Sequence, residues 1–333
     1  MRTLTPSPSS PVTPAEPPQF SIIVPTYEAA STVAEAVASA LAQTYPAKEV
    51  IVCDDGSRDD PASALAPVMD RIVFFRQDNA GPSEARNAAI ARATGEFIVN
   101  LDADDVLAPG NLAARAELLR RRPDLDIVCT NGAVTVGGET VKSFYQPDWE
   151  FEVDDQRAAI LQRCFIIFWA ARRSRILEVG GFDNRVSQAE DLDLWIRMIF
   201  SGSRAGLVDE PLATYRLHRD SLSTHPLGVL GARMAALEKA LASGDLNQRE
   251  AAIARGVIEG DRLDYRLAAA TEALLERDPA ARSQLRSLVT TRGLSRQARA
   301  RAAIAWLAPG PARRLLTRRG QHTSGDVFLP PTG

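Results

Sequence analysis

Short apolar runs separated by amphipathic segments constrain the fold of this chain more than any other feature. The runs are FSIIV (20–24), EVIVC (49–53), RIVFF (71–75) and EFIVNL (96–101). Continuous apolar strands that alternate with helices indicate an α/β fold, with a mainly parallel sheet covered by helices on both faces. Ligands of such sheets bind beyond the carboxyl ends of the strands. The residues that follow these runs are therefore the first candidates for a functional site.

Helical patterns fill the intervals between the runs. Thr32 and Glu35 have the spacing of a capping box at the start of a helix predicted within 31–43. A second helix is expected to open near Pro82 and stop at Gly95, and a third to cover 112–122.

After about residue 125 the alternation loosens. We predict strands over 126–136, 164–170 and 205–218, the last with a turn at Pro211, and a helix over 187–202. Beyond Thr224 only helical patterns follow. The expected organisation is a disordered leader (1–18), a main domain (19–222), a helical C-terminal region (223–322) and a tail (323–333).

Composition narrows the class of protein. With 45 % hydrophobic and 24 % charged residues, the chain is typical of a soluble globular protein. The net charge of -3 gives no overall case for nucleic acid binding. No apolar run approaches the roughly 18 to 20 residues of a membrane span, and the leader lacks the apolar core of a signal peptide. Cys53, Cys129 and Cys164 lie far apart in apolar runs and are expected to be buried, reduced thiols.

Three aspartates follow the strand predicted at 96–101, namely Asp102, Asp104 and Asp105. If the strand direction continues, Asp102 and Asp104 project to the same side and offer the oxygen ligands that Mg²⁺ or Mn²⁺ prefers. The alternative is a polar turn in which Asp104 or Asp105 caps the helix that follows. A D-x-D triplet alone does not decide between them, but its place at a strand end favours the metal.

Two further clusters face the same edge of the predicted sheet. Asp55, in VCDDGSRDD (52–60), either forms a turn or accepts an N–H group from a nucleobase, and Asp60 is expected to cap a helix. Arg86 lies about one turn into the helix that opens at Pro82. It either reaches a diphosphate or a base, or is an exposed arginine paired with Glu84.

The segment SQAEDLDLWIRM (187–198) contains a second acidic group. Ser187 and Glu190 have capping-box spacing, so one interpretation of Glu190 is that it only caps the helix. Asp191, in the first turn, is either an acid that the helix dipole favours or a carboxylate placed as a general base. In TYRLHRDSLS (214–223), His218 follows Arg216 in alternation and is either a structural residue or a phosphate or metal contact.

Taken together, these stretches resemble the family 2 glycosyltransferases, a large group with the GT-A fold that uses nucleotide sugars. The resemblance rests on SIIVPTYEAA with CDDGSRDD, on GPSEARNAAIA leading into NLDADD, and on GGFD followed by AEDLDLWIRM and YRLHRDSLS. The motifs occur in family order over residues 20 to about 222. The chain lacks the Q-x-x-R-W signature and the membrane spans of the family's processive synthases, so the resemblance implies a single-addition enzyme.

The resemblance implies an inverting, metal-dependent sugar transfer from a nucleoside diphosphate sugar of the UDP, dTDP or GDP type. It implies these roles: Pro25, Thr26, Glu28, Asp55 and Arg86 at the nucleotide, Asp102 at the ribose or metal, Asp104 on Mn²⁺ or Mg²⁺, and Asp191 as general base, with Glu190 and Trp195 on the acceptor side and Arg216 and His218 at the diphosphate. The acceptor would be a saccharide or a lipid-linked sugar in bacterial surface polysaccharide or glycolipid assembly. The rival hypothesis is an inactive nucleotide-sugar-binding scaffold. The expected location is the cytoplasm.

The C-terminal region matches no family motif. Between 281 and 320 there are ten arginines and no acid, with Trp306, Leu307, Leu315 and Leu316 interleaved. This pattern is typical either of peripheral contact with anionic lipid at the inner face of the membrane, or of a solvated helix face whose leucines pack on the main domain.

Overall fold

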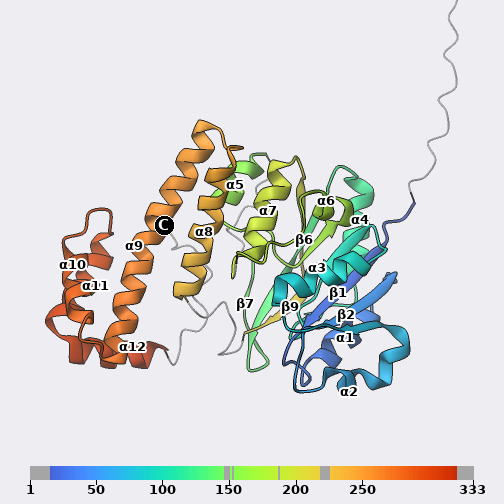
Figure 1. The fold of residues 1–333 in the computed structure, drawn as a ribbon, viewed down its shortest axis with the longest axis horizontal. Helices are drawn as coiled ribbons and strands as arrows, with labels where there is room; N and C mark the ends of the chain where they lie inside the picture. The colour runs from blue at the N-terminus through green and yellow to red at the C-terminus, as the bar shows by residue number, and fades with distance from the viewer. Residues whose placement is uncertain (1–15, 146–150, 152–153, 187, 218–225, 321–333) are drawn as a thin grey trace, which may run out of the picture.

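The computed structural model describes residues 16–145, 151, 154–186, 188–217 and 226–320 (Figure 1). In Figure 1 the sheet and the helices that cover it form one side of the molecule, and helices α8 to α12 extend from it on the other side. The sheet is mixed, with the strand order β3-β2-β1-β4-β8-β6-β9-β5 and with β7 paired to β6.

The described strands are β1 (Phe20–Thr26), β2 (Glu49–Asp54), β3 (Val73–Arg76), β4 (Phe97–Asn100), β5 (Val106–Leu107), β6 (Ile127–Val136), β7 (Glu139–Ser143), β8 (Trp169–Arg172) and β9 (Ala205–Arg216). The helices are α1 (Val33–Leu41), α2 (Pro61–Leu65), a 3-10 helix (Ala66–Arg71), α3 (Pro82–Arg92), α4 (Asn111–Arg121), α5 (Gln156–Gln162), α6 (Arg173–Glu178), α7 (Glu190–Phe200), α8 (Pro226–Ser243), α9 (Gln248–Glu276), α10 (Ala281–Val289), α11 (Arg296–Leu307) and α12 (Pro309–Gly320).

The N-terminal half of the sheet is parallel, as the sequence predicts. β1 lies between β2 and β4 and pairs with both in parallel, and β3 continues this block on the far side of β2. Beyond β4, strand β8 inserts antiparallel between β4 and β6. The carboxyl ends of β1, β2 and β4 therefore meet at one edge, and the motif residues begin there.

Successive residues of the central strands enter two different hydrophobic clusters, one on each face of the sheet. Ile23, Ile51 and Ile98 pack with α3, α5 and α7, whereas Ile22 and Val99 pack with α1 and α4. Successive strand side chains point to opposite faces, and a strand covered on both sides must be apolar at every position. This explains why the runs show no alternation.

Several predicted element boundaries are wrong for identifiable reasons. Of the strand predicted at 164–170 only the end is strand, because β8 begins at Trp169. The helix opening at Pro82 ends at Arg92. β9 runs on past Pro211 without a turn, and its register against β6 shifts there instead. Proline has no N–H to donate to a ladder, so a bulge is the natural response.

Caps also differ from expectation. The Thr32 side chain makes no cap hydrogen bond, and Glu35 forms an ion pair with Arg216 at 2.5 Å. Asp60 does cap α2, as predicted, by accepting a hydrogen bond from the Ser63 amide at 3.2 Å.

The C-terminal helices divide into two parts. α8 and the first half of α9 extend the core on the α7 face of the sheet, through residues such as Leu237 and Ile258. The end of α9 with α10, α11 and α12 forms a separate cluster around Leu274, Leu285 and Leu288. Among the described helices none is long and apolar enough to cross a membrane.

Candidate active site

The three aspartates after β4 lie in a tight turn. The Asp105 amide donates a hydrogen bond to the Asp102 carbonyl oxygen at 3.0 Å, so the strand direction does not continue as expected. Exposure nevertheless alternates: Asp102 and Asp104 are partly exposed, whereas Ala103 and Asp105 are buried. Neither Asp104 nor Asp105 caps the next helix, because the N-cap of α4 is Gly110.

Arg86 contacts more of the predicted site residues than any other side chain described in this section. Its side chain is buried. The alternative interpretation of Arg86, as an exposed arginine paired with Glu84, is therefore wrong. Its two terminal nitrogens donate to Asp102 Oδ1 at 3.1 Å and to Glu190 Oε1 at 2.9 Å, and its Nε donates to Asn100 Oδ1 at 3.3 Å. One guanidinium thus joins the end of β4 to the start of α7.

The charges around Arg86 fix its protonation state. Burial alone lowers the pKa of a guanidinium, but Asp102, Asp191 and Glu190 outweigh burial and raise the pKa of Arg86 above its ordinary value. A permanent cation is therefore held among three carboxylates. The fork of the guanidinium suits this role, since it donates to several oxygens in fixed directions.

Glu190 and Asp191 begin α7, whose N-cap is Ala189. Glu190 is buried and accepts a hydrogen bond from Arg86. Because the N-cap is Ala189, the interpretation of Glu190 as half of a capping box is wrong. Asp191 Oδ1 is buried and has no hydrogen-bond partner in the described part of the chain. Burial, opposed by Arg86 and helped by Glu190 and Asp102, raises the pKa of Asp191 to about 7. A carboxylate with a pKa near neutrality is matched to proton transfer.

Asp105 lies behind the turn, where its Oδ1 accepts the Arg216 amide at 3.0 Å. Burial, and then the charges of Asp102 and Asp104, raises the pKa of Asp105 well above its ordinary value. The Arg216 side chain pairs with Glu35, and the Arg86 guanidinium pairs with Asp102.

Asp55, which is predicted to contact a nucleotide, already accepts hydrogen bonds from the protein. Its oxygens accept from the Gln77 side chain at 2.8 Å and from the amides of Ala80 and Gly81 at 3.0 and 2.8 Å. These contacts fix the approach to α3, and a role at a nucleobase stays a prediction. Glu28, with φ at 50°, accepts from the Arg58 Nε at 3.0 Å.

Pro25 and Thr26 end β1, next to this edge of the sheet. Pro25 is partly exposed and Thr26 is buried. Their role at a nucleotide also stays a prediction. His218 lies outside the described residues.

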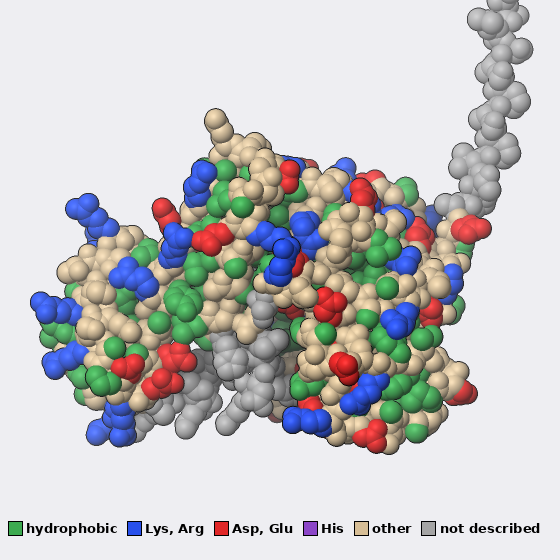
Figure 2. All heavy atoms as spheres, viewed as in Figure 1, with side chains coloured by type: hydrophobic (Ala, Val, Ile, Leu, Met, Phe, Trp, Pro, Cys, Tyr) green, Lys and Arg blue, Asp and Glu red, His purple; other side chains and the backbone are tan. Residues whose placement is uncertain are grey.

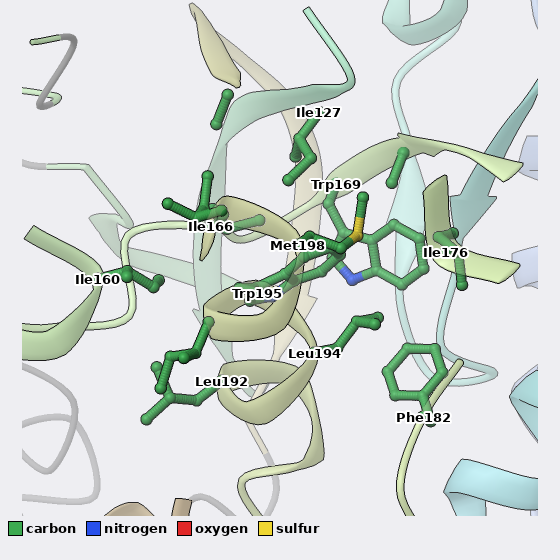
Figure 3. Packing of buried hydrophobic residues seen from close by; sticks show 14 of the residues in the cluster. Ile127, Ile160, Ile166, Trp169, Ile176, Phe182, Leu192, Leu194, Trp195 and Met198 are labelled. Atoms are coloured by element: carbon green, nitrogen blue, oxygen red, sulfur yellow. The ribbon is translucent and has the colours of Figure 1, made fainter. Parts of the chain in front are cut away.

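The role predicted for Trp195 in shaping the acceptor side stays a prediction, and its side chain has no exposed surface with which to contact an acceptor directly. Its side chain is fully buried, and its ring lies 4.9 Å from that of Trp169. Figure 3 shows Trp195 among Trp169, Met198 and Ile166 beneath α7. Trp195 follows Asp191 by four residues and therefore lies on the same face of α7, one turn further along the helix, where it packs in the core with Trp169 and Met198.

Sequence reasoning missed the side chains that hold the start of α7 in place. Asn87 accepts the Phe182 amide at 2.9 Å and donates to the Phe182 carbonyl at 2.8 Å, which ties α3 to the loop before α7. Gly181 makes this possible, because its φ is +72° and a Cβ there would lie 2.6 Å from Asn87 Oδ1.

Lys239 of α8 is the second such side chain. Its ammonium group pairs with Asp183 at 2.6 Å and Asp193 at 2.7 Å. No local pattern around Lys239 indicates this contact, because its partners lie 46 to 56 positions earlier in the chain.

A divalent ion fits the donor set, although in the described residues no group of three or more His, Cys, Asp or Glu side chains is placed to hold one. Mg²⁺ and Mn²⁺ bind through one or two carboxylates plus substrate phosphates and water. Asp102 Oδ2 takes no hydrogen bond from the described residues, and Asp104 is partly exposed beside it.

Comparison with known proteins identifies the family. Residues 21–180 match the model of glycosyl transferase family 2. That part of the chain belongs to this family. The motifs that meet at Arg86 in the structure lie within the matched residues or, in the case of α7, directly after them.

The curated relatives are glycosyltransferases. The chain is 27 % identical over 190 residues to an uncharacterized glycosyltransferase of Rickettsia typhi, a match that covers 55 % of this chain and 59 % of the relative. It is 26 % identical to the putative teichuronic acid biosynthesis glycosyltransferase TuaG of Bacillus subtilis, over 62 % of this chain and 82 % of TuaG. It is 32 % identical to the chondroitin synthase of Escherichia coli, over 54 % of this chain and 26 % of the synthase. The first of these relatives is thus matched over about three fifths of its length.

Solved structures confirm the GT-A fold. S. aureus TarS 1-349 superposes with a TM-score of 0.59 at 18 % identity, covering 92 % of this chain and 93 % of that one. The mannosyltransferase PcManGT of Pyrobaculum calidifontis, solved with GDP-Man and Mn2+, gives a TM-score of 0.59 at 22 % identity, over 92 % of this chain and 85 % of the other.

Proposed function

We propose that this protein transfers a sugar from a nucleoside diphosphate sugar to an acceptor hydroxyl group with inversion at the anomeric carbon. The observation that carries the proposal is Arg86, which links the turn carrying Asp102 and Asp104 to the first turn of α7 carrying Asp191. Membership of the matched region in the family supports it. A donor site and a base are thus held at one edge of the sheet.

Asp191 acts as the general base. Its buried Oδ1 takes no hydrogen bond from the described residues, so a lone pair is free to accept the acceptor's proton. The acceptor oxygen then attacks the anomeric carbon from the face opposite the leaving diphosphate. Arg86 opposes the rise in the pKa of Asp191, which favours its ionised form, and it occupies Glu190, so that a single carboxylate serves as base.

Asp102 and Asp104 would hold Mn²⁺ or Mg²⁺, which neutralises charge on the leaving nucleoside diphosphate when bound. Solved neighbours contain UDP, UDP-GlcNAc, or GDP-Man with Mn2+. These complexes support a nucleotide sugar as donor. Relatives named for teichuronic acid and chondroitin synthesis support an acceptor in polysaccharide assembly.

The test separates binding from transfer. Purified wild type and Asp191→Asn are mixed with each nucleotide sugar and a mixed acceptor extract, and acceptor-dependent release of nucleoside diphosphate is measured beside nucleotide affinity. We expect release to fall at least about 10²-fold while affinity changes less than about threefold, as for loss of a general base. Equal release by both proteins would remove Asp191 from the mechanism. Binding without turnover in the wild type would favour the scaffold hypothesis.

A further inference from the structure

The end of the described chain carries exposed apolar side chains of a kind that the main domain mostly buries. On α11, Ile304 and Leu307 are 61 % and 68 % exposed, and on α12 Leu315 is 57 % exposed. Ile304 and Leu307 are three residues apart in a helix and so share a face. α12 packs on the same cluster as α11 through Leu316, which leaves the neighbouring Leu315 outside.

Cations surround these apolar side chains. Residues 281–320 contain ten arginines and no acid. Exposed side chains among them are those of Arg282, Arg286, Arg292, Arg296, Arg299, Arg301 and Arg314. Figure 2 shows Lys and Arg side chains along the outer edge of the part of the molecule that Figure 1 labels α10 to α12. The surface formed by α10, α11 and α12 is called the C-terminal basic surface below.

A cavity of about 280 Å³ opens on this surface, between the end of α9 and helices α10 to α12. Three guanidinium side chains line it, those of Arg277, Arg282 and Arg313, with one acid, Asp278. The Asp278 carboxylate accepts the Ala280 amide at 2.7 Å. No ion pair joins Arg277 or Arg282 to an acid within the described part of the chain. The cavity therefore has the charge and size to take a phosphate group.

Trp306 completes the surface. It is partly buried in the cluster of α9 to α12, and the Arg286 guanidinium lies 6.0 Å from the centre of its ring. Tryptophan beside arginine at the border of an apolar patch is typical of protein that sits at a lipid headgroup layer.

We propose that the C-terminal basic surface docks on an anionic phospholipid bilayer. Ile304, Leu307 and Leu315 would enter the headgroup layer, while the arginines bind lipid phosphates. A second copy of the chain fits less well, because two surfaces with seven exposed arginines each repel one another. Nucleic acid satisfies the arginines but gives the three aliphatic side chains no partner. A bilayer satisfies both.

This proposal does not depend on sugar transfer. If the proposed transfer is also correct, docking holds the enzyme beside lipid-linked acceptors.

The experiment is co-sedimentation of the full chain with large vesicles of phosphatidylcholine alone or mixed with phosphatidylglycerol. We expect binding to the mixed vesicles only, and weaker binding at high salt because exposed charges are screened. Ile304→Asp/Leu307→Asp should lower the partition coefficient about tenfold or more. Arg299→Gln/Arg301→Gln should lower it about fivefold per arginine.

Controls match each change. Val141→Asp replaces another exposed aliphatic side chain, 53 % exposed on β7, and should bind like the wild type. Leu315→Asp tests the surface independently on α12. All variants should keep the wild-type Tm, because the replaced side chains are exposed.

Three results would overturn the proposal. The first is vesicle binding that Ile304→Asp/Leu307→Asp leaves unchanged, because another surface would then bind lipid. The second is no binding to the mixed vesicles, together with a dimer in sedimentation velocity that the same variant dissociates. The third is no vesicle binding and a monomer, whether or not the chain binds RNA.

Discussion

Replacing Arg86 by methionine removes the cation that the structure places among Asp102, Glu190 and Asp191. Methionine has a similar length, so the main effect is electrostatic. The Glu190 side chain is only 11 % exposed in its pair with Arg86, whereas that of Asp102 is 40 % exposed and keeps access to water. Removing one partner of a buried ion pair costs about 3–5 kcal/mol. For a domain of this size, that loss lowers the Tm by about 10 °C.

The loss should depend on pH with a definite sign. Arg86 lowers the pKa of Asp191, so without the guanidinium the folded-state pKa of Asp191 rises further above its unfolded value than the wild-type pKa of about 7. A carboxylate with a raised folded-state pKa loses stability as the pH rises through that pKa. The Tm of the Arg86→Met variant should therefore be much closer to the wild-type Tm at pH 5 than at pH 8.

Differential scanning calorimetry at pH 5 and pH 8 measures the loss in Tm and its dependence on pH. Arg120→Met is the control, because Arg120 pairs with Glu117 on the surface of α4 with 71 % of its side chain exposed. Exposed pairs contribute about 0–1 kcal/mol, so this variant should keep the wild-type Tm at both pH values. A Tm loss in Arg86→Met that is equal at pH 5 and pH 8 would refute the electrostatic account.

Three further predictions concern α7 and the loop before it. Asp191→Asn should raise the Tm at pH 8 by a few degrees, since a carboxylate with a folded-state pKa raised to about 7 loses stability as the pH rises from its unfolded pKa of about 4 through that value. The gain should be smaller at pH 5 and vanish below about pH 4; an unchanged Tm at pH 8 contradicts this. Lys239→Met should lower the Tm by a few degrees and reduce kcat more than nucleotide affinity, because two aspartates lose their shared partner, whereas Arg262→Met on the exposed face of α9 should change neither. Gly181→Ala should lower the Tm by several degrees, since both its φ of +72° and its approach to Asn87 exclude a Cβ; a wild-type Tm would show that the loop adapts freely.

The parallel part of the fold is predictable because local runs of apolar residues indicate its strands. The runs that contain Ile22, Ile51 and Ile98 are apolar at successive positions, and only a strand covered on both faces requires that. Boundaries after residue 125 were predicted less well. β8 contributes only Trp169–Arg172 to the sheet, and apolar residues before it, such as Phe165, are buried in loop conformation. Burial alone does not distinguish a strand from a packed loop.

The candidate site was predicted in its members but not in its connections. Asp102, Arg86 and Glu190 were each named from a motif, yet their mutual contacts span up to 104 positions in sequence. The full burial of Trp195 was not predicted, because a motif gives a position along a helix, whereas the exposure of that position depends on what the helix packs against. Lys239 was missed because its partners lie on other elements.

The most direct test of the central claim is a thermal-shift panel of UDP, dTDP and GDP, each with and without Mn²⁺, on the wild type and on Asp104→Ala. The account predicts that one nucleotide raises the Tm of the wild type only with metal. It also predicts that Asp104→Ala abolishes this rise while its own Tm without ligand stays near that of the wild type. A bound nucleotide at 100 times its Kd contributes about 2.7 kcal/mol, which this assay resolves as several degrees. No metal-dependent rise with any of the three nucleotides, or an equal rise in Asp104→Ala, would contradict the assignment of this site.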